Sequence, residues 1–325
     1  MMGMPTHGDA EPMTLPQAID PRSGAVRAGS WQAWVAAVRP RSLPVAVSPV
    51  LVGAAFGFAR QGAIDGVAAL LVLGASLLMQ VVTNLQNDVG YTVRGAERSG
   101  TRTGLPRATA NGWLSVRQVR LAIVLCALLA TALGLALVAW GGWPVLAVGV
   151  ASLLAALAYM GGPRPIAYTP FGELTVFVFF GLVAVVGTDW VLTGGSSSGT
   201  LMAAAAVGSL AAAALAVNNH RDIAHDRLVG RRTFAVCFGE RGSQRLFATL
   251  LALPFLLLLP LALVLGSPVL LLPAVLLPPA WQLWRDFVQC ARGLPFNGVL
   301  FRTFRLGLWF ALALAASALL ARMVG

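Results

Sequence analysis

Long, uncharged apolar runs separated by short polar loops make up most of this sequence, and few folds can accommodate such a pattern. Hydrophobic residues account for 58% of the 325 residues and charged residues for only 11%. A soluble domain carries about 25% charged residues. Inside a bilayer the backbone must satisfy its own hydrogen bonds, and about 20 apolar residues make a spanning helix. The sequence therefore predicts an all-α integral membrane protein.

Nine of these runs are candidates for spanning helices, and they fill a single transmembrane domain over residues 31–325. Six prolines between positions 254 and 279 predict kinks or breaks in the seventh and eighth runs. Residues 1–30 are polar and rich in Pro and Gly, which predicts a disordered cytoplasmic tail rather than a signal peptide. The nine predicted spans are 43–59, 67–87, 119–140, 144–160, 174–192, 201–218, 246–265, 268–283 and 306–321.

The basic residues follow the alternation of the loops. All 23 are arginine, and they give the chain a net charge of +11. Most lie in alternate loops, at 39–41, 94–120, 164, 221–245 and 285–305, whereas the intervening loops are short and nearly uncharged. The positive-inside rule then places the N-terminus in the cytoplasm and the C-terminus outside. We expect the membrane to be the cell inner membrane, with the polar loops on its cytoplasmic side. This topology explains the charge without a nucleic-acid partner.

A polar motif directly follows the sixth run. On a helix, Asn218, Asp222 and Asp226 fall at i, i+4 and i+8 and share one face. Two carboxylates one turn apart repel each other unless a cation lies between them. The donors around them that suit phosphate oxygens are Arg221, Arg227, Arg231 and Arg232. The set matches what a diphosphate–Mg²⁺ complex requires. The alternative is a solvated loop whose charges only set the topology.

A similar motif ends the second run. Asn84, Asp88 and Tyr91 share a helical face, and Asn and Asp oxygens suit Mg²⁺. Both motifs lead into Arg-rich loops on the same side of the membrane, and this weak echo suggests two related halves facing one another. Alone, the motif fits an Asn/Asp helix end with a basic loop equally well. The pairing of the two motifs favours a metal–phosphate site.

Further polar positions lie between and beyond the motifs. Arg164 and Tyr168 could contact an anionic substrate, although a single Arg in a cytoplasmic loop ordinarily sets topology. Glu173 opens an apolar run, where a carboxylate costs several kcal/mol without a partner or an interfacial position; it also suits a helix N-terminus. Asp189 lies far from the motifs, and we expect no catalytic role for it. The three cysteines show no metal-type spacing.

Together these motifs resemble those of the intramembrane aromatic prenyltransferases of the UbiA superfamily. The resemblance covers about residues 31–325 and is strongest to the branch that prenylates 1,4-dihydroxy-2-naphthoate in menaquinone synthesis. The most specific stretch is Asn218-Asn219-x-Arg221-Asp222-x-x-x-Asp226-Arg227 with Gly-Arg-Arg-Thr at 230–233. The other matching stretches are Arg-Pro-Arg-Ser-Leu-Pro-Val at 39–45, Asn-Leu-Gln-Asn-Asp at 84–88, Tyr-Met-Gly-Gly-Pro-Arg-Pro at 159–165 and Gly-Glu at 172–173.

The resemblance implies a nine-helix bundle and a Mg²⁺-dependent reaction within the membrane lipid. A polyprenyl group passes from a polyprenyl diphosphate to an aromatic acid; in the naphthoate branch, loss of CO₂ gives demethylmenaquinol. The residues implied to be catalytic and to hold Mg²⁺ are Asp88, Asp222 and Asp226. Those implied to bind substrate are Asn84, Asn87, Arg94, Arg107, Tyr159, Arg164, Asn218, Arg221 and Arg227.

One position departs from the family pattern, because a second carboxylate expected to help hold Mg²⁺ is replaced here by Tyr91. Asn84, Asn87, Asp88 or Glu97 could substitute for it, or Tyr91 marks a branch with altered metal use or substrate. The alternatives left open are another acceptor (4-hydroxybenzoate, homogentisate or a tetrapyrrole), a non-catalytic lipid-binding homologue, and a transporter. Transporters usually place charges near the midplane, whereas these acids cluster at one membrane face, which favours an enzyme. Prenyl chain length and oligomeric state stay open.

Overall fold

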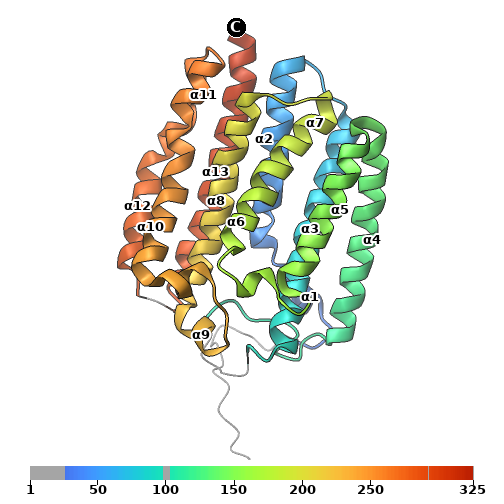
Figure 1. Ribbon diagram of the computed structural model, residues 1–325, viewed down its shortest axis with the longest axis vertical. Coiled ribbons are helices and arrows are strands. Elements are labelled where there is room, and N and C mark those ends of the chain that lie inside the picture. Colours follow the sequence, from blue (N-terminus) through green and yellow to red (C-terminus); the bar gives the residue numbers. More distant parts are fainter. Residues whose placement is uncertain (1–25, 98–102, 292, 325) are drawn as a thin grey trace, which may run out of the picture.

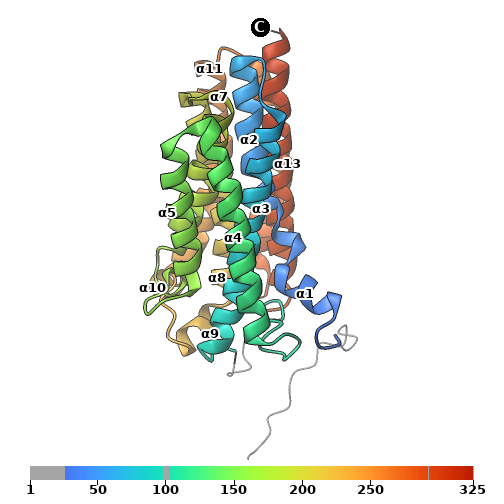
Figure 2. The ribbon, with the colours of Figure 1, turned by 90° about the vertical axis from the view of Figure 1, so that its right-hand side faces the viewer.

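The computed structural model describes residues 26–97, 103–291 and 293–324, and over these ranges the chain is a bundle of long helices without strands. Figures 1 and 2 show the helices side by side, with α1 and α9 at one end and the C-terminus at the other. Most of the predicted disordered tail, residues 1–25, lies outside the described residues. The bundle confirms the predicted all-α fold.

The helices match most of the apolar runs and extend several of them. The first half of the chain contains α1 (Trp31–Val38), η1 (Pro40–Ser42), α2 (Pro44–Gln61), α3 (Gly66–Val93), α4 (Val116–Gly141) and α5 (Trp143–Met160). The fifth span combines α6 (Gly172–Phe177), η3 (Val178–Val186, a π-helix) and α7 (Gly187–Thr193), preceded by η2 (Ile166–Tyr168). The remainder contains α8 (Ser198–Arg221), α9 (Ile223–Leu228), α10 (Phe234–Leu256), α11 (Leu258–Val264), η4 (Pro268–Leu276), α12 (Leu277–Gln289) and α13 (Phe296–Val324).

Nine spans were predicted, and the structure does not confirm that number. Within the described residues, seven helices are long and apolar enough to cross a membrane; an eighth is obtained if residues 31–42 and α2, which meet at a 43° bend, count as one span. The predicted span 268–283 is instead a 3₁₀ segment, η4, followed by the short helix α12. Pro273 lies inside η4 and α12 begins with prolines, so a continuous α-helix cannot form there.

Helix α8 lies at the centre of the bundle. Its most apolar window is 78% buried, against 6–39% for the other spanning helices. Much of α8 is alanine, whose small side chain lets neighbouring helices approach closely. The central position holds the polar motif at the end of α8 on a rigid element.

The fifth span and α8 approach each other closely in this core. A Cβ added to Gly181 would lie 2.5 Å from the Cα of Gly208 and 2.7 Å from the carbonyl oxygen of Ala204. Both contacts are with backbone, which cannot rotate away. Only glycine therefore fits at position 181.

This packing predicts that Gly181→Val destabilises the protein. Forcing a side chain into a close-packed core costs about 1–3 kcal/mol, and we expect the thermal unfolding midpoint in detergent to fall by roughly 2–10 °C. The control is Gly134→Val, where an added Cβ meets no heavy atom within 4 Å. An unchanged midpoint in Gly181→Val would contradict the packing.

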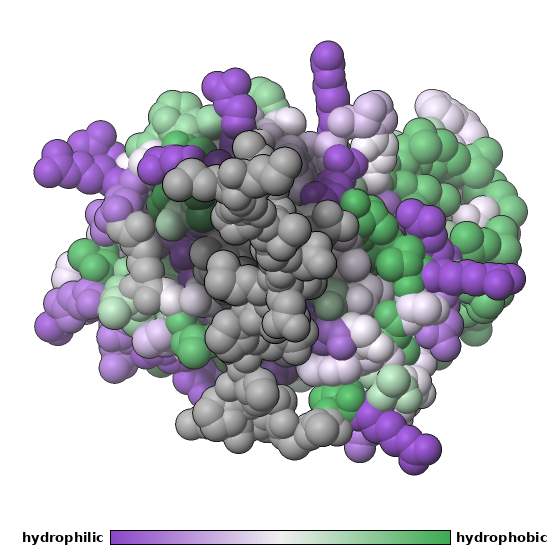
Figure 3. All heavy atoms as spheres, turned by 90° about the horizontal axis from the view of Figure 1, so that it is seen from below, coloured by the Kyte–Doolittle hydropathy of each residue, from purple (hydrophilic) through white to green (hydrophobic). Residues whose placement is uncertain are grey.

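Both polar motifs lie at the same end of the bundle. The end of α3, the loop after it and the α8–α9 junction all face the end that carries α1 (Figure 1). Hydrophilic side chains gather around the edge of this end (Figure 3). The predicted juxtaposition of the two motifs is therefore confirmed, and this end is called the polar end below. That it faces the cytoplasm stays a prediction.

Candidate functional site

A large cavity opens among the helices. Its volume is about 800 Å³, and its walls are mostly apolar. At the polar end it reaches Asn84, Asn87, Asn218 and Arg221, which we call the polar mouth. Residues such as Leu137, Val145 and Trp190, near the opposite end of the bundle, also line it. The cavity can therefore hold a long apolar group with a polar head at the mouth.

The second motif lies at a break between two helices. Helix α8 ends at Arg221, and α9 begins at Ile223. Asp222 N still donates to Asn218 O at 3.1 Å, and Asp226 N donates to Asp222 O at 2.7 Å. These two i to i−4 bonds bridge the break, at which Asp222 itself has the non-helical angles φ −96° and ψ 10°. That the three side chains share one face stays a prediction.

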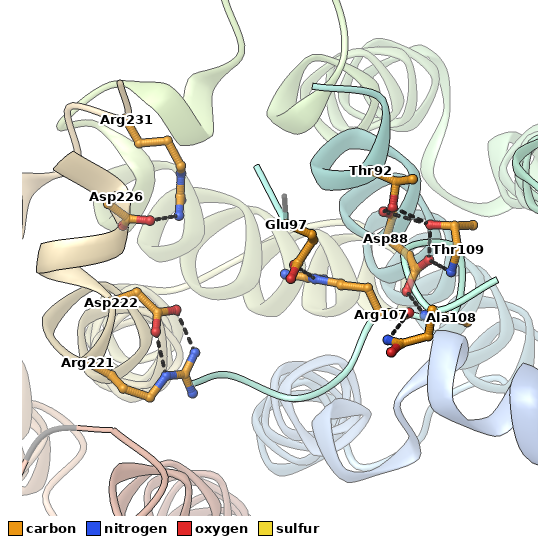
Figure 4. A network of polar contacts seen from close by, with 11 residues as sticks. Asp88, Thr92, Glu97, Arg107, Ala108, Thr109, Arg221, Asp222, Asp226 and Arg231 are labelled. Carbon is orange, nitrogen blue, oxygen red and sulfur yellow. Dashed lines mark hydrogen bonds and ion pairs between the residues drawn. The ribbon is translucent and has the colours of Figure 1, made fainter. Parts of the chain in front are cut away.

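The two carboxylates of this motif are buried and each is paired with an arginine. Arg221 donates to both oxygens of Asp222, through Nε at 2.8 Å and NH2 at 2.7 Å. Arg231 donates to Asp226 at 2.5 Å and to the carbonyl oxygen of Ala167. Figure 4 shows both pairs on one side of the polar end. Charge-assisted bonds of this kind are strong, so the arginines neutralise the two acids.

Asp88, in the first motif, holds a loop. Its carboxylate accepts hydrogen bonds from Ala108 N at 2.9 Å, Thr109 N at 2.8 Å and Thr109 Oγ1 at 2.6 Å, and its side chain is fully buried. Thr92, one turn along α3, also contacts the hydroxyl of Thr109. Asp88 therefore fixes the segment that carries Arg107 (Figure 4). Nothing in the sequence near residue 108 signals this pairing.

Tyr91 lies between two arginines. The guanidinium carbon of Arg107 is 4.2 Å from the centre of the Tyr91 ring, and that of Arg231 is 5.1 Å from it. Arg107 also pairs with Glu97, with 3.5 Å between Nε and Oε1. In Figure 4, Arg107 and Glu97 reach into the space between the two motifs. The tyrosine thus brings together Arg107, from the loop between α3 and α4, and Arg231, from the loop between α9 and α10.

One more arginine takes part at the edge of this cluster. Arg94 lies over the ring of Tyr168 at 5.4 Å and contacts the carbonyl oxygen of Gly162. Burial raises the pKa of Tyr168, so this phenol stays neutral. Burial lowers the pKa of Arg231, but the acidic groups around it, including Asp226 and Asp222, raise it by more, and the guanidinium stays charged.

The remaining predicted substrate-binding residues divide into two groups. Asn84, Asn87, Tyr159, Asn218 and Arg221 line the cavity, and Asn84 also donates to Val38 O and Ser42 Oγ. Arg164 and Arg227 are exposed outside it. The structure therefore gathers the first group at the cavity and leaves the second group at the surface.

Glu173 has the partner that its position requires. Its Oε1 accepts a hydrogen bond from Asn219 Nδ2 at 2.9 Å, and the side chain is 5% exposed. Its second carboxylate oxygen has no hydrogen-bond partner among the described residues. Asp189 lies at the opposite end, where Arg60 and Thr200 bond it; it ties α2, α7 and α8 together and is far from the polar mouth.

The two motifs differ in how well they fit a divalent metal. Among the described residues, no three His, Cys, Asp or Glu side chains form a metal-binding group. Mg²⁺ usually takes only one or two carboxylates and completes its shell with water and substrate phosphates. Asp222 and Asp226 offer two carboxylates of this kind, but each is paired with an arginine in this structure and neither lines the cavity. The first motif does not offer two, because Asp88 accepts three hydrogen bonds and Tyr91 lacks a carboxylate.

This geometry predicts the effect of removing the Asp88 carboxylate. In Asp88→Ala the backbone N–H groups of Ala108 and Thr109 lose their acceptor, which costs about 1–3 kcal/mol per buried group. We expect the loop to detach and trypsin to cleave after Arg107, which is 4% exposed in the wild type. Mass spectrometry of a timed digest would locate the cut. Resistance equal to that of the wild type would contradict this role for Asp88.

Comparison with known proteins supplies the context of the site. Residues 46–293 match the model of the UbiA prenyltransferase family. The chain is 35% identical over 226 residues to a 1,4-dihydroxy-2-naphthoate octaprenyltransferase of Escherichia coli, covering 68% of this chain and 73% of that one. It is 34% identical over 236 residues to a protein of the same name from Mycobacterium tuberculosis, covering 70% and 77%.

Solved structures agree in fold. A UbiA homologue from Archaeoglobus fulgidus bound to DMAPP and Mg²⁺ has a TM-score of 0.61 at 17% identity, covering 87% of this chain and 99% of that one. The apo structure of a UbiA homologue from Aeropyrum pernix has a TM-score of 0.63 at 16% identity, with coverages of 85% and 97%. At these identities the likeness concerns the fold alone.

Proposed function

The chain belongs to the UbiA prenyltransferase family, and from that premise we propose that it transfers a polyprenyl group from a polyprenyl diphosphate to 1,4-dihydroxy-2-naphthoate. It is a prenyltransferase and an integral membrane protein. Loss of the ring carboxylate as CO₂ then gives demethylmenaquinol. The acceptor proposal is supported by the names of the relatives from Escherichia coli and Mycobacterium tuberculosis.

The observation that carries the proposal is the apolar cavity joined to a mouth of amide and guanidinium groups. A polyprenyl tail is insoluble in water, and each buried methylene contributes about 0.8 kcal/mol. The diphosphate at its head needs cationic donors, which Arg221 offers at the mouth. One molecule with both properties matches the whole length of the cavity.

Asp222 and Asp226 would hold the metal of this reaction. When bound, Mg²⁺ offsets the negative charge that develops on the leaving diphosphate. Arg221 is paired with Asp222 through two nitrogens and also donates to Asn297, so it can turn toward a phosphate oxygen while Asp222 takes a cation. Asn218, one turn earlier and lining the same mouth, orients the head group by hydrogen bonds.

The walls of the cavity protect the reacting carbon. Ionisation of the allylic C–O bond leaves a carbocation that water would quench, and the apolar lining excludes water. Tyr159 and Phe180 also line the cavity, and aromatic faces stabilise cations. The electron-rich naphthoate ring is then alkylated. We further propose that the protein lies in the cell inner membrane with its polar end in the cytoplasm, in keeping with the arginine-rich loops.

An assay of the purified protein tests this function. It would contain Mg²⁺, labelled octaprenyl diphosphate and 1,4-dihydroxy-2-naphthoate, with 4-hydroxybenzoate in a parallel reaction. We expect a prenylated naphthoquinol whose formation EDTA prevents. Reaction with the benzoate alone would overturn the acceptor, and no product with either acceptor would overturn the proposed activity.

A further inference from the structure

We propose that the two halves of the site bind the donor differently. Only the α8–α9 half takes a metal ion, whereas the α3 half binds phosphate through the guanidiniums of Arg107 and Arg231, which pack against the ring of Tyr91. The proposal rests on the proposed function and names how its donor is held. It starts from the finding that the first motif does not fit a metal.

The first step concerns what Asp88 does. Its two oxygens accept three hydrogen bonds from Ala108 and Thr109, and coordinating a metal would compete with bonds that hold the loop. These hydrogen bonds to Ala108 and Thr109 fix the position of the adjacent Arg107. Its side chain is brought to 5% exposure beside Tyr91. Asp88 is thus a positioning residue for a cation.

The second step concerns the ring of Tyr91. Arg107 at 4.2 Å and Arg231 at 5.1 Å both lie within range of a cation–π interaction with this one ring. Two buried guanidiniums so close together repel each other, and Glu97 and Asp226 compensate them in this state. A neutral ring packs against both guanidiniums without neutralising their charge, so an incoming anion can exchange for Glu97 and Asp226.

The third step concerns the ligand. Guanidiniums match phosphate oxygens through paired N–H groups. The loop that carries Arg107 reaches the cavity, since Leu105 lines it together with Asn87. A donor with its tail in the cavity therefore presents its diphosphate to this loop. If a metal bound Asp226, Arg231 would lose its partner and could turn toward the same anion. The ring of Tyr91 would then position both Arg107 and Arg231 for the diphosphate.

Counting bound metal ions tests the proposal without relying on turnover. The probe is a non-ionisable prenyl thiodiphosphate, with Mn²⁺ replacing Mg²⁺ and measured by electron paramagnetic resonance. We expect one Mn²⁺ per wild-type chain in the presence of the analogue and one in Tyr91→Phe, which keeps the ring. We expect a second in Tyr91→Asp. Two ions in the wild type would overturn the proposal.

Binding of the same analogue in EDTA supplies the second readout. We expect the wild type to bind the analogue measurably without metal, and we expect the affinity of Arg107→Gln for the analogue to be about tenfold lower. In the metal titration Arg107→Gln should still bind one Mn²⁺. The matched control is Arg117→Gln, an exposed arginine at the start of α4, which should bind like the wild type. Equal affinities of Arg107→Gln and the wild type in EDTA would overturn the proposal.

The failure of the inference is distinguishable from failure of the proposed function. If the wild type forms product and binds the analogue with two Mn²⁺, only the asymmetric site is wrong. If the wild type binds no analogue even with Mn²⁺, the proposed donor is wrong and the inference falls with it. Thermal midpoints measured for every variant identify any that fail to fold.

Discussion

Asp222→Asn should lower kcat for prenyl transfer by about 10²–10³-fold, the size of effect seen when one group that stabilises developing charge is removed. The substitution keeps the shape of the side chain, and its amide oxygen can still accept a bond from Arg221, which donates to both oxygens of Asp222 in the wild type. It removes the negative charge that the metal requires. The protein should therefore fold while losing activity, as measured by initial rates at saturating substrates.

The dependence on Mg²⁺ separates this role from a structural one. A weaker metal ligand raises the Mg²⁺ concentration needed for half-maximal rate, so high Mg²⁺ should partly restore Asp222→Asn. The control is Asp286→Asn, whose carboxylate pairs with Arg302 at a partly exposed position outside the cavity; such pairs contribute about 0–1 kcal/mol. A wild-type rate and Mg²⁺ requirement in Asp222→Asn would overturn the assignment of the metal.

Hydropathy and charge alternation predicted much of the architecture because they report on the membrane, which acts on every residue of the chain. They identified the apolar runs and placed both motifs at one end. One exception is 43–59, which counts as a span only together with the bent segment before it. The other is 268–283, where hydropathy is high but prolines interrupt the helix. Backbone geometry prevails over apolar composition in that segment, and the predicted breaks in the seventh and eighth runs are confirmed.

The site was less predictable because its side chains meet through the tertiary fold. Periodicity predicted a shared face for Asn218, Asp222 and Asp226. It could not show that Asp88 is bonded by Thr109, or that Tyr91 lies between Arg107 and Arg231. These pairings depend on how loops fold back over the bundle, and a short polar motif carries no signal of that. The predicted role of Asp88 as a metal ligand is untested, and our proposal assigns Asp88 the positioning of Arg107 instead.

Because the cavity is deep, we expect a second large effect when its far end is filled: the enzyme should no longer accept long prenyl donors. Gly187 lines the cavity, and an added Cβ there meets no heavy atom within 4 Å. It begins α7, toward the end of the bundle opposite the polar mouth (Figure 1). In Gly187→Trp the indole should fill the space that distal isoprene units occupy. The polar mouth should remain unchanged.

We expect Gly187→Trp to lose about 100-fold in kcat/KM with octaprenyl diphosphate and little with geranyl diphosphate. Excluding one isoprene unit forfeits roughly 3 kcal/mol of apolar burial, at about 0.8 kcal/mol per methylene, and each 1.4 kcal/mol is tenfold. Leu263→Trp on the exposed face of α11 controls for the added bulk. Unchanged use of the long donor would mean that the tail leaves for the lipid before it reaches Gly187; the ratio of the two donors decides this even if total activity falls.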